Sequence, residues 1–475
     1  PKLVSFIIEG MTVPNSDIHT GEESLIVQVP EEADLTALKV TMEYINGTIM
    51  DFQNGVALDY TNPRSFKIKG VDEETIYTYE FIITTEKVGP ASIKAMTING
   101  IETDYVLTDD KNVAVPYIPA LMDFTSVNVE LTAGFGNKID ESFTGQGLNL
   151  MNGNNKVSIK GSNGVTTEFT IGIPQISAEP TFKKNYTELV GFGSDNLICT
   201  AISDPYIVAS NHSSSKTPAY FDYTGNKIDN LSAVGLSIAT HGIRILATDD
   251  KGNILGAALG TDKPVIYRWS NVTAKATEFI SFDKSVIGET ATPRLAGISI
   301  IGDLDGDATI VAPKAQSVDV FVWKVIGGVL NPVPQKYTFP VATPSFYWTV
   351  NPMPIGMSGY MGFYTAKGAN GLIWLNSTMG EVSRMSGLIT TGGDMVKIEN
   401  RVYVAYTVYA DSKGIMRICD ITDGKYNQIF NYTMEASGAN GNSTTSASLM
   451  VKNNELYAVF GCTGSGLYFY RIACK

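Results

Sequence analysis

The chain has little histidine and none of the short motifs that mark common enzyme classes. Its 475 residues include three histidines, His19, His212 and His241, which lie far apart in the sequence. A Gly-x-Ser-x-Gly elbow, a Walker loop and a His-Glu-x-x-His motif are all missing. So is the Ser-x-Asp-x-Gly-x-Thr-Trp box of sialidase propellers. These absences point away from an enzyme, although the carboxylate pairs of glycosidases leave no spacing signature because they come from separate strands.

Cysteine is also scarce. The four cysteines are Cys199, Cys419, Cys462 and Cys474, and their spacing fits no metal site. Cys462 and Cys474 flank one predicted hairpin at unmatched heights, which disfavours a disulfide between them. We therefore expect four free, mostly buried thiols, and no metal or other cofactor.

The chain also has fewer basic than acidic residues, and it has no long apolar run. With 35 Lys and Arg against 48 Asp and Glu, the net charge is −13 and the pI about 4.8. A field of this sign repels phosphate backbones and anionic lipids, so nucleic acid is excluded as a partner. No apolar stretch approaches the length of a membrane-spanning helix. The chain opens at Pro1, and we expect that a leader has been removed from a longer precursor.

What the chain has in abundance is material for strands and turns. It contains 45 glycines, 23 tyrosines and 20 phenylalanines, while only 17% of its residues are charged. Aromatic residues favour strands and glycine favours the turns between them. The length exceeds what one core can organise. The composition therefore predicts an all-β protein of several domains.

The first part of the sequence contains one pattern twice. Four segments, at 3–10, 27–44, 65–70 and 77–84, are followed about 90 residues later by matching segments at 92–100, 113–132, 157–161 and 166–173. Within them apolar residues alternate with others, as for Leu25, Val27 and Val29. This period and length predict two tandem immunoglobulin-like sandwiches, residues 1–88 and 89–176, which we interpret as spacers.

A longer pattern fills the rest of the chain. One group of strands recurs about six times at intervals of about 45 to 55 residues, which is the period of a four-stranded propeller blade. The second strands of the six repeats are predicted at 206–211, 243–250, 308–314, 360–367, 402–410 and 456–463. The last repeat has no fourth strand, and the segment 181–192 has no partner. We therefore expect residues 177–475 to form a β-propeller of six blades, give or take one, closed by the 181–192 strand.

The stretch "GDLDGDATI" (302–310) raises the question of a calcium site at Asp303, Asp305 and Asp307. It departs from the EF-hand loop because Ala308 stands where glycine is needed and Lys314 where the bidentate glutamate should be. Aspartate and glycine also suit a tight turn between two strands without metal. We favour the turn.

A binding site is expected where the innermost propeller strands begin, around the channel mouth. Two carboxylates, an arginine and aromatic rings gathered there would suit a polar ligand such as a sugar. The alternative is that these side chains only cap the channel, with Trp348 buried between blades. The predicted binding residues are Asp195, His212, Arg294, Tyr347, Trp348 and Asp394.

The repeated "V-x-V-P…D-[LF]-T…[IV]-K-G" pattern, followed by a propeller with the "GD-x-x-GDATI" turn, resembles surface lipoproteins of gut Bacteroidetes described as cell-adhesion or glycan-utilisation proteins. The resemblance implies export, attachment to the outer membrane through a lipid at the N-terminus, and a place on the cell surface. It brings no binding residues with it.

Three functions follow as hypotheses. The first is a non-catalytic binding protein, with the sandwiches as a stalk and the propeller as a head that holds a glycan or a surface protein. The second is a glycoside hydrolase or lyase that uses channel-mouth carboxylates such as Asp195 and Asp394. The third is a structural adhesin subunit with a protein partner.

Overall fold

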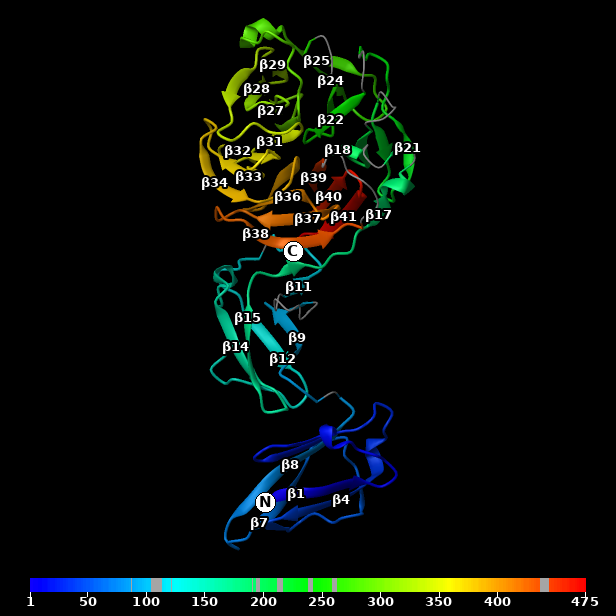
Figure 1. Cartoon of the computed structure of the whole chain (residues 1–475), viewed down its shortest axis with the longest axis vertical. Coiled ribbons are helices and arrows are strands. Elements are labelled where there is room, and N and C mark those ends of the chain that lie inside the picture. Colours follow the sequence, from blue (N-terminus) through cyan, green and yellow to red (C-terminus); the bar gives the residue numbers. More distant parts are fainter. Residues whose placement is uncertain are drawn as a thin grey trace. The chain divides into compact units, whose positions relative to one another are not determined.

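The structure is a computed structural model of the chain. It describes residues 1–86, 88–103, 113–120, 122–189, 191–193, 197–211, 217–237, 242–258, 263–435 and 444–475. The chain divides into two compact units (Figure 1). Unit 1 comprises Pro1–Ala114 and Asp123–Ile173, and unit 2 comprises Val115–Met122 and Pro174–Lys475. The predicted domain boundaries at 88/89 and 176/177 stay a prediction.

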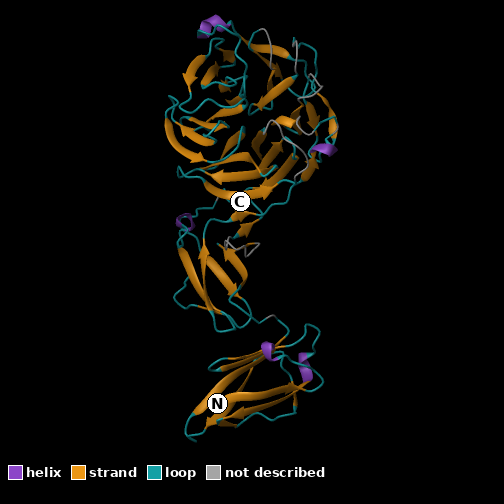
Figure 2. Ribbon diagram, viewed as in Figure 1, coloured by secondary structure: helices purple, strands orange, loops and turns teal. Residues whose placement is uncertain are grey.

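The protein is all-β, as its composition predicts. In the described residues the helical elements are 3-10 turns of three or four residues, and every other regular element is a strand (Figure 2). The 3-10 turns are η1 (Asn15–Asp17), η2 (Leu35–Ala37), η3 (Leu150–Asn152), η4 (Tyr186–Glu188) and η5 (Lys284–Ile287).

The first half of unit 1 has two sheets around one core. One sheet has the order β1 (Lys2–Ile8), β4 (Leu38–Ile45), β6 (Ala57–Leu58). The other has the order β2 (Ile18–Thr20), β3 (Ser24–Gln28), β8 (Ile76–Thr84), β7 (Arg64–Gly70), β5 (Gly47–Ile49), with β3 and β8 parallel. The alternation in β3 works as period-2 geometry requires, because Leu25 and Val27 enter this core while Ile26 packs on Ile82 outside it.

The second half of unit 1 also has two sheets. One has the order β10 (Ile101–Thr103), β9 (Ile93–Ile98), β12 (Val129–Ala133), and the other β13 (Lys138–Ile139), β14 (Asn155–Lys160), β15 (Thr166–Ile171). Their inward residues alternate along the strands, as Val157 and Ile159 do in β14. The two sequence copies therefore form strands at matching places.

Unit 2 contains sheets in which consecutive strands pair antiparallel. The first sheet consists of β18 (Leu197–Ser203), β19 (Tyr206–Asn211), β20 (Ala219–Phe221) and β21 (Lys227–Asn230), and the second of β22 (Ile243–Thr248), β23 (Ile254–Ala258), β24 (Val265–Trp269) and β25 (Thr277–Ser281). The third consists of β26 (Ser299–Gly302), β27 (Ala308–Pro313) and β28 (Asp319–Ile326), and both β29 (Val329–Leu330) and β30 (Gln335–Thr338) pair with β28. The fourth consists of β31 (Trp348–Pro352), β32 (Tyr360–Tyr364), β33 (Gly371–Leu375) and β34 (Glu381–Ser386), and the fifth of β35 (Gly393–Ile398), β36 (Arg401–Ala410), β37 (Lys413–Asp420) and β38 (Asn427–Thr433).

The last sheet joins distant parts of the chain. It has the order β17 (Phe182–Asn185), β41 (Gly466–Ala473), β40 (Glu455–Cys462), β39 (Thr445–Lys452). β17 lies within the 181–192 segment that sequence analysis assigns to the last repeat, and Phe182 pairs with Phe469. β41 therefore has a paired strand on both sides.

Each sheet of unit 2 packs on the next through apolar side chains. Ile266 of one sheet shares a cluster with Ile310 of the following sheet, and Phe363 shares one with Tyr406. Phe221 of the first sheet packs with the sheet of β17. The first strands contact one another in the order β18, β22, β26, β31, β35, β39, and β39 contacts β18. The series of contacts between first strands therefore ends at β18, the strand where it began.

Residues 115–122 belong to unit 2, whereas the sequence analysis assigns them to the second sandwich. The N–H of Ile118 donates to the Ala473 carbonyl at 2.8 Å, and the N–H of Lys475 donates to the Ile118 carbonyl at 2.9 Å. Arg401, which also forms an ion pair with Asp420 at 2.6 Å, donates to the Met122 carbonyl at 3.1 Å. Backbone hydrogen bonds explain why a segment from another part of the sequence joins this unit.

The second repeat of unit 2 corrects one expectation. Residues 243–250 are predicted as a second strand, but β22 (Ile243–Thr248) is the first strand of its sheet, and β23 is the second. The predicted turn 240–242 lies mostly outside the described residues. The turn between β22 and β23 is instead built on Asp249, which accepts the backbone N–H of Asn253 at 2.8 Å.

Candidate functional site

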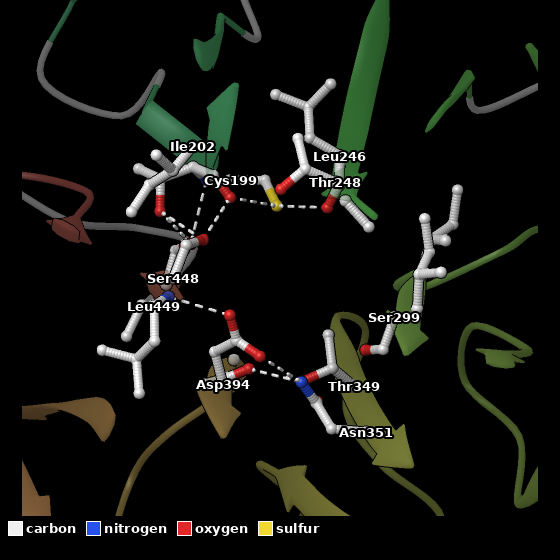
Figure 3. A pocket seen from close by; sticks show the side chains of 18 of the residues that line it. Cys199, Ile202, Leu246, Thr248, Ser299, Thr349, Asn351, Asp394, Ser448 and Leu449 are labelled. Atoms are coloured by element: carbon white, nitrogen blue, oxygen red, sulfur yellow. Dashed lines mark hydrogen bonds between the residues drawn. The ribbon is translucent and has the colours of Figure 1, made fainter. Parts of the chain in front are cut away.

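A cavity of about 520 Å³ lies between the first strands of the sheets of unit 2 (Figure 3). Its wall is made by β18, β22, β26, β31, β35 and β39 with their adjacent turns. Asn351 bonds with Gly393 and Thr349 bonds with Thr391, so both hydrogen bonds join residues that are 42 positions apart. Because this separation is constant, the neighbouring first strands β31 and β35 run in the same direction. The cavity therefore has one end where first strands begin and one where they finish.

The wall is polar because the first strands carry hydroxyl side chains. Many of these hydroxyls connect neighbouring sheets. Thr200 Oγ1 lies 2.7 Å from Ser446 Oγ, and Ser448 Oγ donates to the Thr200 carbonyl at 2.7 Å. Thr445 Oγ1 accepts the N–H of Thr391 at 2.8 Å. Side chains thus replace the ladder hydrogen bonds that separate sheets do not share.

Asn351 and Asp394 form a polar pair in the wall, in which Asn351 is buried and Asp394 is half-buried. Asn351 Nδ2 donates to the Gly393 carbonyl at 2.9 Å and lies 3.4 Å from Asp394 Oδ1. The Asp394 carboxylate accepts the backbone N–H groups of Met395 and Leu449, each at 2.8 Å. Figure 3 shows the two side chains next to each other at the edge of the cavity.

Burial determines the pKa of Asp394, the member of this pair that can ionise. The pKa of Asp394 is raised to about 6, chiefly by desolvation and to a smaller extent by the nearby Asp250 charge, although hydrogen-bond donors to the carboxylate lower it. The donors come from Met395, Leu449 and Asn351. The carboxyl group therefore titrates close to neutral pH.

At the end where the strands begin, the described lining residues are buried. Arg244 Nη1 donates to the Tyr347 hydroxyl at 2.9 Å, and Thr391 and Thr444 line the same end. Arg244 lies near the start of β22, so its guanidinium is at this end of the cavity. Tyr347 is also in edge contact with Phe346, with ring centroids 4.5 Å apart.

At the end where the strands finish, the lining residues reach solvent. Asp250, Lys251 and Lys452 are exposed there. Lys452 forms an ion pair with Asp204. Although Asp250 is exposed, partial desolvation of its carboxyl group and the Asp249 charge raise its pKa. The described part of the cavity thus opens among charges of both signs.

The predicted site residues do not form one group. Asp195 and His212 lie outside the described residues. Tyr347 and Asp394 line the cavity. Arg294 is exposed and lies over the Phe346 ring at 5.0 Å, outside the cavity wall. Their joint role in binding stays a prediction.

Trp348 is placed where the alternative interpretation put it. Its side chain has 0% exposure, its Nε1 donates to the Lys314 carbonyl at 2.9 Å, and its ring packs on Phe339. The ring is covered by the neighbouring sheet, so it offers no stacking surface to a ligand in this structure.

The three aspartates of the Gly302–Ile310 stretch all have protein partners, one within the turn and two outside it. Asp303 Oδ1 accepts the N–H of Asp305 at 2.8 Å, and Asp307 Oδ1 accepts the N–H of Gly327 at 2.8 Å. Asp305 forms an ion pair with Arg268 at 2.7 Å. In the described part of the chain, no three His, Cys, Asp or Glu side chains gather in a metal-binding group. The four cysteines are free thiols.

Sequence analysis missed Arg244 and Asn351. Arg244 is missed because its strand is assigned to the wrong position in its sheet. Asn351 gives no local signal, but it lies on the first strand of the sheet before that of Asp394, at a similar height. Serine and threonine at alternate positions of a first strand, such as Ser446 and Ser448, are a pattern that could have marked the wall.

Two parts of the sequence match known families. Residues 3–81 match the family described as "SGBP, N-terminal", and residues 190–337 match "Domain of unknown function (DUF8500)". SGBP proteins are surface-associated, glycan-binding proteins of Bacteroidetes. The match supports a surface protein of the glycan-utilisation type. No curated protein matches the chain.

Two solved structures are similar in outline. A DUF4623 family protein from Bacteroides eggerthii is 13% identical, with coverage of 81% of this chain and 99% of its own and a TM-score of 0.49. The SapL1 lectin in complex with alpha methyl fucoside is 9% identical, with coverage of 60% and 97% and a TM-score of 0.39. Both TM-scores are below 0.5, too low to establish a common fold.

The structure contains no helix, within its described residues, that has the length and apolar character to cross a membrane.

Proposed function

We propose that this protein binds glycans at the Bacteroidetes cell surface without cleaving them. The match of residues 3–81 to the SGBP family carries this proposal. It is further supported by a polar cavity whose lining mixes hydroxyl, amide, carboxylate and guanidinium groups, the kinds of group that pair with sugar hydroxyls.

The proposal includes a division of labour. Unit 2 is a six-bladed β-propeller that acts as the binding head, and unit 1 is a pair of immunoglobulin-like sandwiches that acts as a stalk. The return of the first-strand contacts from β39 to β18, and the pairing of β17 with β41, support the propeller. Two two-sheet halves with matching strand positions support the sandwiches. Export and a lipid anchor at the N-terminal side complete the proposal.

We place additional glycan contacts outside the cavity, at Arg294 and Phe346. The Arg294 guanidinium over the partly exposed Phe346 ring offers donors beside an apolar face, an arrangement that suits a sugar ring. Tyr347 connects this surface to Arg244 in the cavity wall.

The test is retention of the full chain in native gels cast with starch, xylan, galactomannan, laminarin or mucin, together with an assay for released reducing ends. We expect retention by at least one polysaccharide and no release of reducing ends. Release would support the hydrolase hypothesis. Absence of retention on every polysaccharide would overturn glycan binding and favour a protein partner.

Arg294→Ala in the same gels tests the outer contacts, because it removes the cation over Phe346 and leaves the cavity wall intact. We expect weaker retention than for Lys336→Ala, which removes a cation on β30 that bonds with Glu289.

A further inference from the structure

The cavity contains a buried acceptor that the protein itself does not satisfy. Asn351 is 6% exposed, and its Oδ1 has no hydrogen-bond partner among the described residues. The amide orientation is fixed, since Nδ2 faces two acceptors, the Gly393 carbonyl and Asp394 Oδ1. A buried acceptor without a partner destabilises the fold, so its retention points to a ligand that supplies a donor.

A second acceptor group stands beside it. Asp394 Oδ1 receives the N–H of Met395 and Oδ2 receives that of Leu449, and each carboxylate oxygen can accept more than one hydrogen bond. Backbone donors from β35 and β39 therefore hold the carboxylate in place. Asn351 Oδ1 and Asp394 together offer adjacent, preorganised acceptors on the cavity wall.

The surroundings of this pair indicate the class of ligand. An anion is excluded by the carboxylate. A metal ion is disfavoured because the described residues bring no three His, Cys, Asp or Glu side chains together. Hydroxyls of Thr248, Ser299 and Thr349 line the same cavity and can donate or accept. Two neighbouring acceptors within a hydroxyl-rich wall fit two adjacent hydroxyls of a sugar ring.

The shape of the wall limits how a glycan can enter. In the described part of unit 2, first strands of successive sheets line the cavity on all sides, which favours entry of a chain along the strand direction, by its end. A volume of about 520 Å³ lies within the range of small-molecule sites, about 300–1,000 Å³, and suits one or two sugar units.

We infer that the cavity binds the terminal unit of a glycan, with two adjacent ring hydroxyls donating to Asn351 Oδ1 and to the Asp394 carboxylate. This inference rests on the proposed function and adds that recognition is of chain ends and not of internal units.

The test uses the full chain and isothermal titration calorimetry with maltotriose, xylotriose, mannotriose and laminaritriose, beside the parent polysaccharides. We expect a trisaccharide to bind with the same affinity as its polymer when the polymer concentration is expressed as chain ends. Asn351→Leu should weaken that affinity at least tenfold. The matched control is Asn431→Leu, an exposed position on β38 outside the cavity, which should bind as the natural chain does.

The isosteric Asp394→Asn keeps the inference testable if Asn351→Leu fails to fold, and it should also weaken binding at least tenfold. The inference is overturned, with glycan binding intact, if these variants bind normally or if affinity rises with the number of internal units. If neither polysaccharides nor trisaccharides bind, the proposed function fails and this inference with it.

Discussion

Unit 1 and the centre of unit 2 use opposite kinds of interior. In the first half of unit 1, aromatic rings fill the core: Phe66 stacks on Tyr79 with centroids 5.3 Å apart, and Phe81 meets Tyr60 edge-on at the same distance. At the centre of unit 2, hydroxyls, an amide and a carboxylate face a cavity. Apolar packing in unit 2 lies between the sheets instead.

In unit 2, the side chains that stabilise the fold are therefore different from the side chains that can face a ligand. Sheets that pack face to face, as those of unit 2 do, already bury their apolar side chains, so the first strands are not needed for a dry core. Their side chains can join sheets by hydrogen bonds, as Thr200 and Ser446 do, or face a ligand, as we infer for Asn351. Four experiments test this contrast, from the largest expected effect to the smallest.

Phe81→Ala should destabilise unit 1 by about 3–5 kcal/mol, because the ring is 1% exposed and its removal leaves a cavity among aromatic neighbours. Urea unfolding followed by circular dichroism should show an earlier transition for unit 1 with that of unit 2 unchanged. Tyr77→Ala, an exposed position on the same strand β8, is the control. A common shift of both transitions would contradict independent cores.

Asp394 should make the stability of unit 2 depend on pH between about 4 and 6. Its folded pKa of about 6 exceeds the ordinary aspartate value of 3.8, so the folded state binds the proton more tightly and stability falls as pH rises through this window. The loss is at most about 3 kcal/mol. The charged group that acts on it is Asp250, and Asn351, Met395 and Leu449 donate to it.

Asp394→Asn should remove this slope in urea titrations at pH 4.5 and pH 7, whereas the exposed turn variant Asp411→Asn should keep it. Equal slopes in both variants would show that Asp394 is not the group responsible.

Gly297→Ala should destabilise unit 2 by about 1–3 kcal/mol. A Cβ at this position would meet Thr349 and come within 2.6 Å of the Trp348 carbonyl oxygen, which forces β26 and β31 apart. Gly306→Ala, whose nearest neighbours are 3.7 Å away on Asp303, should be nearly neutral. Thermal unfolding of the pair compares the two, and equal melting temperatures would argue against close contact at this seam.

Thr200→Val should cost about 1 kcal/mol, since it removes a hydroxyl that bonds with Ser446 between the first and last sheets. Thr248→Val, on the cavity wall of β22, should change stability by less than about 0.5 kcal/mol. A larger loss of stability for Thr248→Val than for Thr200→Val would mean that hydroxyls of the cavity wall, and not those between the first and last sheets, hold the sheets together.

Local patterns predicted much of the fold. Period-2 alternation located β3 and its inward residues Leu25 and Val27, and aspartate with glycine indicated the turn after β26. Both signals act over a few residues, where sequence neighbours decide the conformation.

The site was less predictable because its geometry depends on distant strands. Whether Trp348 faces a channel or a neighbouring sheet is decided by Phe339 and Lys314, which approach from the preceding sheet. The apolar stretch at 243–250 could be a first or a second strand, and that choice alone moves Arg244 into the wall or out of it. Pairing across sheets leaves no mark in a local pattern.

The pairing of β17 with β41 has a consequence for the order of events during synthesis. Residues 182–185 emerge early and find their partner, residues 466–469, only after nearly all of unit 2 has been made. Until then β17 is a strand with open edges and the sheets remain an unfinished series, a state that can pair with other chains. The pairing of β17 with β41 is therefore a late step of high contact order, and a chain cut before Gly466 is expected to aggregate, even though the five preceding sheets of unit 2 are complete in the described residues.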